Sequence, residues 1–109
     1  MSWSISAAML EPAPARLQAF MALAAQIRPD YTIWIHKPWN TMDCEARAQH
    51  LCDVMSFATG KRQSFAARPG TATQWQMDAL GGQSIVAEAP GSGLSTRTAA
   101  RWADGALAL

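Results

Sequence analysis

The residues best suited to chemistry lie in one short segment, YTIWIHKPWNT, which spans positions 31–41. His36 is its acid–base candidate, because an imidazole can take up or release a proton near neutral pH. Asp43 follows soon after and would form a polar pair with His36 across a turn. The chain has no GxSxG nucleophile motif, and neither cysteine adjoins a glycine-rich turn that would expose it. We therefore predict a non-enzymatic protein, with a small enzyme that uses His36 as the least favoured alternative.

A metal site would need several ligands that converge on one point. The candidate ligands are His36, His50, Cys44 and Cys52, but no CxxC, HxxxH or HExxH spacing occurs. On one helix, His50 would also lie about 120° around the axis from Cys44. We therefore expect no metal ion and no other cofactor.

The cysteine spacing suggests a compartment. Cys44 and Cys52 are separated by eight positions in what the pattern predicts to be a single helix. A rise of about 1.5 Å per residue would place them roughly 12 Å apart, beyond the roughly 7 Å limit between Cα atoms that a disulfide can bridge. The sequence thus predicts two free thiols and, with them, a reducing, cytoplasmic location.

A glycine-containing loop, GSGLSTR at 91–97, leads into a helix start. Its N–H groups could hold a phosphate, but the Lys-Ser/Thr pair of a P-loop is missing, so a linker and helix cap is the preferred interpretation. Residues 93–102 also resemble the turn and recognition helix of the helix-turn-helix family, which implies DNA binding. Pro90 and Gly91 would interrupt the supporting helix, so nucleic-acid binding by the helix at 95–104 is kept as an unlikely alternative.

Two helices and a strand are predicted in the first half of the chain. Prolines begin a helix near position 12, apolar residues follow at helical spacing, and Pro29 ends it at position 28. Positions 31–36 are β-branched and aromatic, which favours a strand that Pro38 stops. A second helix is expected from position 40 or 41 until Gly60.

A period of two predicts three strands in the second half. They are expected at 63–68, 73–80 and 84–89, with the last two forming a hairpin around Gly81 and Gly82. Ser95 would cap a last helix that runs to position 104 and ends at Gly105.

These elements define an α+β fold in the order α-β-α-β-β-β-α. We expect a mainly antiparallel four-stranded sheet with the helices packed on one face. The 109 residues would form one domain, in which 1–11 are irregular and 105–109 are a short apolar tail.

Composition argues against nucleic acid and membranes. Nine Lys or Arg and eight Asp or Glu give a net charge of +1, so there is no strong basic footprint. No apolar run reaches the roughly 20 residues of a membrane span, and the first residues lack the basic start of a signal peptide.

Tryptophan content favours binding to another protein. Five Trp and six Met, with only 16% charged residues, exceed what a small core needs and indicate an apolar surface that a partner covers. We predict a small protein–protein interaction domain that acts as a regulator, adaptor or inhibitor of a larger, unidentified protein, of the kind that phages and plasmids encode. A homodimeric structural protein is the nearest alternative.

The predicted partner-binding surface combines aromatic anchors with a polar rim, because Trp and Arg dominate interface hot spots. Its residues are Trp34, His36, Lys37, Trp39, Arg62, Trp75 and Trp102.

Overall fold

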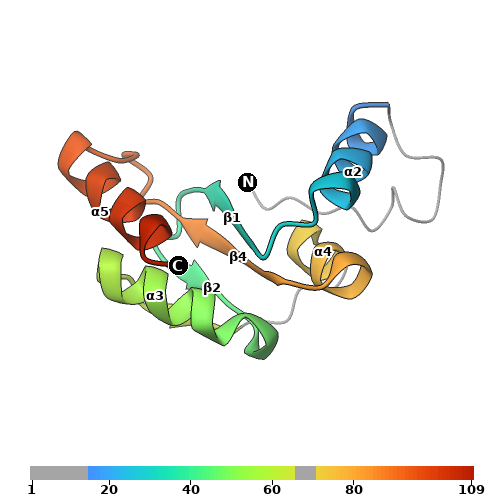
Figure 1. The fold of residues 1–109 in the computed structure, drawn as a ribbon. Helices are drawn as coiled ribbons and strands as arrows, with labels where there is room; N and C mark the ends of the chain where they lie inside the picture. Colours follow the sequence, from blue (N-terminus) through green and yellow to red (C-terminus); the bar gives the residue numbers. More distant parts are fainter. Residues whose placement is uncertain (1–14, 66–70) are drawn as a thin grey trace.

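The structure is a computed structural model that describes residues 15–65 and 71–109. The first predicted helix and the first predicted strand are present, although the proline-led start of that helix lies outside the described residues. The elements in chain order are α2 Ala15–Ile27, β1 Tyr31–His36, β2 Met42–Asp43, the 3-10 helix η1 Ala46–Ala48, α3 Gln49–Thr59, β3 Gln63–Ser64, α4 Ala72–Leu80, β4 Gln83–Glu88 and α5 Thr96–Leu107 (Figure 1).

The sheet is mixed, with the strand order β1-β4-β2-β3. β1 and β4 run parallel in a six-residue register that begins at Tyr31 and Gln83 and ends at His36 and Glu88. β2 is antiparallel to β4 and parallel to β3. The predicted α+β class with four strands is therefore confirmed, but the prediction of a mainly antiparallel sheet is wrong.

The error arises at α4, where the sequence predicted a strand. Thr71 caps this helix, since its side chain accepts a hydrogen bond from the backbone N–H of Gln74. Gln, Met, Ala and Leu are good helix formers, and a short alternation of apolar residues does not exclude a helix. Because residues 73–80 are helical, the predicted hairpin with 84–89 does not form, and β4 pairs with β1 instead.

Helices pack against both faces of the sheet, not one as predicted. On one face, Ile85 joins the core cluster of Leu51 and Met55 from α3 and Trp102 from α5. On the other face, Gln76 of α4 donates a hydrogen bond to Thr32 of β1. The ring of Phe20 in α2 meets Trp34 edge-on on that second face, with centroids 5.1 Å apart. Figure 1 shows α3 and α5 together on one side of the long strands, and α2 with α4 towards the other end.

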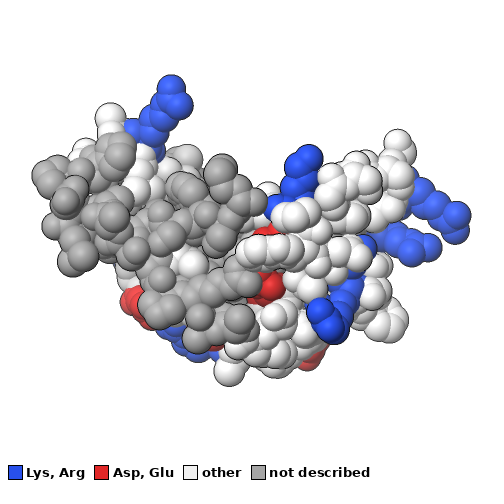
Figure 2. Space-filling model, turned by 180° about the vertical axis from the view of Figure 1, so that it is seen from behind, with Lys and Arg blue, Asp and Glu red and all other residues white. Residues whose placement is uncertain are grey.

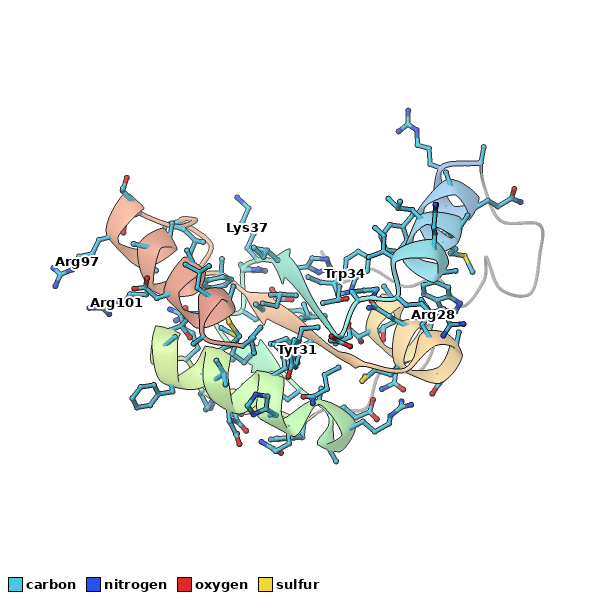
Figure 3. The ribbon with its side chains drawn as sticks, in the orientation of Figure 1. Arg28, Tyr31, Trp34, Lys37, Arg97 and Arg101 are labelled. Carbon is cyan, nitrogen blue, oxygen red and sulfur yellow. A yellow bond between two sulfur atoms is a disulfide. The ribbon has the colours of Figure 1, made fainter. Side chains whose placement is uncertain are left out.

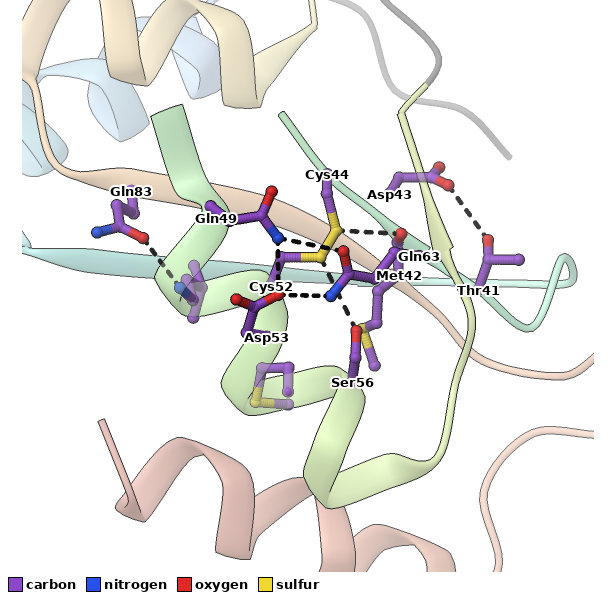
Figure 4. The surroundings of a disulfide bond; sticks show 12 residues. Thr41, Met42, Asp43, Cys44, Gln49, Cys52, Asp53, Ser56, Gln63 and Gln83 are labelled. Atoms are coloured by element: carbon purple, nitrogen blue, oxygen red, sulfur yellow. Dashed lines mark hydrogen bonds between the residues drawn. A yellow bond between two sulfur atoms is a disulfide. The ribbon is translucent and has the colours of Figure 1, made fainter. Parts of the chain in front are cut away.

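The predicted helix from 40 or 41 begins later than expected, and this corrects the cysteine prediction. Cys44 follows the short strand β2, and the chain bends through η1 before α3 begins. This bend brings the Cα atoms of Cys44 and Cys52 to 6.0 Å, and the two residues form a disulfide (Figure 4). The prediction of two free thiols is wrong because the two residues do not share a helix. Gly60 does end α3, in the left-handed conformation at φ 71°.

The last helix begins as predicted but ends later. Ser95 accepts a hydrogen bond from the N–H of Thr98, and the helix continues through Gly105 to Leu107. Gly105 is buried where α5 crosses α3: a Cβ there would lie 2.8 Å from Sδ of Met55 and 2.9 Å from Cβ of Ala58. This glycine permits close helix packing and does not end the helix, so the predicted stop and separate tail are wrong.

Candidate active site

The segment that stood out in the sequence wraps around the carboxyl end of β4. β1 and β2 lie on opposite sides of β4, so the connection between them crosses beyond its last residue. The N–H of Ala89 donates to the carbonyl of His36 on one side, and the N–H of Glu88 donates to the carbonyl of Thr41 on the other, both at 2.7 Å. Trp39 completes the crossing through a β-bridge to Pro90.

This crossing places three polar side chains in a row. His36 and Glu88 are register partners on the parallel strands β1 and β4, so they share a face of the sheet on strands about 4.8 Å apart. Thr41 extends the antiparallel register of β2 opposite Glu88. The hydroxyl of Thr41 donates to Oδ1 of Asp43 at 3.2 Å. β4 lies between His36 and Asp43, so the strand neighbour of His36 is Glu88 and not Asp43 as expected.

Glu88 has the surroundings of a functional carboxyl group. The residue is only 1% exposed, and within residues 15–65 and 71–109 its Oε2 atom has no hydrogen-bond partner. Burying a carboxyl oxygen without a partner costs free energy, and most buried polar atoms are paired. The carboxyl ends of parallel strands are also where sheets of this kind bind ligands. Glu88 and His36 together could accept a proton at one group and donate one at the other.

Sequence reasoning missed Glu88 because it placed this residue in an antiparallel hairpin. The available signal was a single acidic residue after the uncharged run SIVA, in a strand whose residues are mostly buried on both faces. Such near-continuous burial is typical of parallel strands, whose ends carry functional groups.

The exposed members of the predicted partner-binding set lie near this end of the sheet. Trp39 is 52% exposed, and Lys37 and Arg62 are exposed as well. Lys37 projects away from the end of β1 (Figure 3). His36 is half-buried.

The other tryptophans of the set point elsewhere. Trp34 and Trp75 are half-buried, and both rings lie near the ring of Phe20 on the α2 and α4 side. Trp102 is buried in the core on the opposite face. The structure therefore does not bring all seven predicted residues together on one surface.

The described residues contain no helix-turn-helix, because the element before α5 is the strand β4 and not a helix. This arrangement does not support the alternative of nucleic-acid binding. Arg97 and Arg101 do project outward from α5 (Figure 3). On the face shown in Figure 2, however, the Lys and Arg side chains do not merge into a continuous basic surface.

Within residues 15–65 and 71–109, no group of three or more His, Cys, Asp or Glu could hold a metal ion. None of the helices described is both long enough and apolar enough to cross a membrane.

The fold of this chain is also found among solved structures. No protein-family model matches the chain, and no curated protein matches it. The chain is similar to the crystal structure of the murein-tripeptide amidase MpaA from Escherichia coli O157, with a TM-score of 0.66 and 20% identity. The match covers 85% of this chain but only 41% of the amidase, so the chain spans less than half the length of that protein.

Proposed function

We propose that the carboxyl ends of β1 and β4 form the acid–base part of a site that hydrolyses an amide bond. The observation that carries the proposal is the buried Oε2 of Glu88, which has no hydrogen-bond partner in the described part of the chain, on a residue in register with His36. The likeness to an amidase supports the choice of reaction, although it establishes only a common fold. This proposal departs from the sequence-based expectation of a non-enzymatic protein, which the comparison does not confirm.

In the proposed reaction, Glu88 takes a proton from a water molecule that attacks the carbonyl carbon of the amide. The C–N bond then breaks, and the leaving amine takes up a proton, which His36 is placed to supply. The match covers only 41% of the amidase, and we propose that the groups of this protein that hold the substrate and polarise its carbonyl lie outside the described residues.

The test is release of a free amine from murein tripeptide and from simple dipeptides, followed by mass spectrometry. Wild-type protein should release the amine, and Glu88→Gln should lower the rate by about 100-fold or more, the range for loss of a general base. Glu45→Gln is the matched control, because Glu45 lies in the loop before η1 and should leave the rate unchanged. No release above buffer, or equal rates for wild type and Glu88→Gln, would contradict the proposal.

A second candidate function is the protein-binding domain expected from composition. A groove of about 570 Å³ between α3 and α5 supports it, with Val54, Phe57 and Gly105 among its lining residues. Phe57 is 94% exposed, and Leu107, on the last turn of α5, is 84% exposed. In this alternative the domain regulates or inhibits a larger protein, or closes a homodimer.

The binding candidate is tested by replacing Phe57 with Ser and measuring light scattering and capture of a partner from host extract. Trp39→Ser tests the anchor chosen from the sequence in the same assays. A monomer that captures no protein would contradict both the binding and the dimer versions.

The disulfide changes the expected compartment of the protein. The cytoplasmic expectation depended on free thiols, and the Cys44–Cys52 disulfide removes that argument. Because disulfides persist in oxidising surroundings, we propose that the protein works in an oxidising compartment. A reduced Cys44 and Cys52 in protein isolated under thiol-trapping conditions would contradict this.

A further inference from the structure

A polar hollow of about 410 Å³ lies beside Thr41, separate from the acid–base pair. We call it the anion hollow; its lining residues are Trp39, Asn40, Thr41, Gly60, Lys61 and Arg62. Met42 of β2 pairs with both Gln63 of β3 and Ala87 of β4, so the residues just before β2 and β3 lie next to the carboxyl end of β4. The anion hollow therefore lies on the edge of the sheet where ligands of such folds bind.

The side chains of the anion hollow offer mainly hydrogen-bond donors. Nζ of Lys61 donates to Oδ1 of Asn40, which engages the acceptor of that amide and leaves its Nδ2 as a donor. The side chains of Lys61 and Arg62 have no acceptor atoms. The hydroxyl of Thr41 donates its proton to Oδ1 of Asp43.

The charge of the anion hollow is not balanced by its own lining. Lys61 and Arg62 are adjacent cations, no Asp or Glu lines the hollow, and neither cation forms a salt bridge within the described residues. Asp43 is the nearby acid on β2, and one of its oxygens is engaged by Thr41. A group with two negative charges and several acceptor oxygens fits this arrangement better than a singly charged one, because each cation can form a charge-assisted hydrogen bond with it.

We propose that the anion hollow is a binding site for a phosphate group. Lys61 and Arg62 neutralise its charge, and Nδ2 of Asn40 donates to one of its oxygens. This site is independent of the proposed amide hydrolysis, since it uses neither His36 nor Glu88.

The experiment is an NMR titration of the protein with inorganic phosphate, with acetate as the singly charged comparison at matched ionic strength and pH. Phosphate should give saturable shifts at residues 39–41 and 60–62, and acetate should bind at least ten-fold more weakly. The Lys61→Gln/Arg62→Gln variant should lose binding by at least ten-fold. Arg97→Gln/Arg101→Gln removes the same charge from exposed positions on α5 and should bind as wild type does.

Several results would overturn the site. They are shifts that do not saturate, binding that survives in Lys61→Gln/Arg62→Gln, or equal loss in the α5 control, which would indicate attraction by net charge alone. Equal binding of acetate would overturn the assignment to phosphate. If the double variant fails to fold, Asn40→Asp serves instead, because Asp tolerates the left-handed backbone of Asn40, at φ 55°, while adding a negative charge that should abolish binding.

Discussion

Replacing Gly105 with Ala tests whether the two core helices depend on their close approach. Two effects oppose each other. Ala inside a helix is favoured over Gly by about 1 kcal/mol, which would stabilise α5. The new Cβ, however, would lie 2.8 Å from Sδ of Met55 and 2.9 Å from Cβ of Ala58. Met55 can move its flexible end, but Cβ of Ala58 is fixed to the α3 backbone, so the helices must separate.

The expected change in unfolding free energy is the difference between the cost of overpacking and the gain in helix propensity. Overpacking a filled core typically costs about 1–3 kcal/mol, so Gly105→Ala should lower the free energy of unfolding by about 1 kcal/mol net. For a domain of this size, that corresponds to a fall in Tm of roughly 4 °C or slightly more. Ala103→Gly, at an exposed position of α5, measures the helix-propensity term alone in the same helix.

The assay is urea unfolding followed by circular dichroism, on Gly105→Ala, Ala58→Gly and the double variant. The double variant should recover about 1 kcal/mol relative to the sum of the single changes, because Ala58→Gly removes the fixed contact. If Gly105→Ala is more stable than wild type, or the two changes are additive, the tight crossing of α3 and α5 is refuted.

Three further predictions concern the disulfide and two carboxyl groups. Replacing Cys44 and Cys52 with Ala should cost about 2–3 kcal/mol of unfolding free energy, as expected for a loop that closes over eight residues, and a thiol assay on unreduced, unfolded protein should detect no free thiol; an unchanged stability or two reactive thiols would contradict the disulfide. Hydrogen bonds from Gln63 and Gln49 lower the pKa of Asp53, so this contribution to stability is present above the unfolded value of about 3.9 and is lost as the pH falls through the lower folded value. Gln63→Ala should move the pKa of Asp53 upward in a carboxyl NMR titration, and an unmoved pKa would show that the bond is absent in solution. Glu88→Gln should raise the unfolding free energy by about 1 kcal/mol, because a neutral amide costs less to bury than a carboxyl group whose Oε2 has no partner among the described residues; a loss of stability would mean that the carboxyl group has a stabilising contact.

Local signals explain which elements could be predicted from the sequence. The strand at Tyr31–His36, the cap at Ser95 and the stop at Gly60 depend on the residues themselves and on their immediate neighbours. The start of α3 could not be predicted in this way. Met42 and Asp43, which precede it, form a strand only because they pair with the distant strands β3 and β4.

Non-local pairing explains what was missed. The residue types at 83–88 do not indicate that their partner strand is β1. Local sequence alone favoured a hairpin with the preceding segment. Residues 73–80 alternate in the way expected of a strand, but they form the helix α4, which Thr71 caps. The predicted hairpin therefore has no partner strand at these positions. His36 was recognised as an acid–base candidate, but its neighbour Glu88 becomes visible only when β1 and β4 lie side by side.

The decisive measurement of the acid–base role of Glu88 is the rate of amine release by wild type, Glu88→Gln and Glu45→Gln. We expect measurable release by wild type and by Glu45→Gln, and a rate at least about 100-fold lower for Glu88→Gln. The urea unfolding curve of Glu88→Gln shows whether a lower rate comes from the lost carboxyl group or from unfolded protein. Equal release by all three proteins would show that the buried carboxyl group beside His36 has no part in the chemistry.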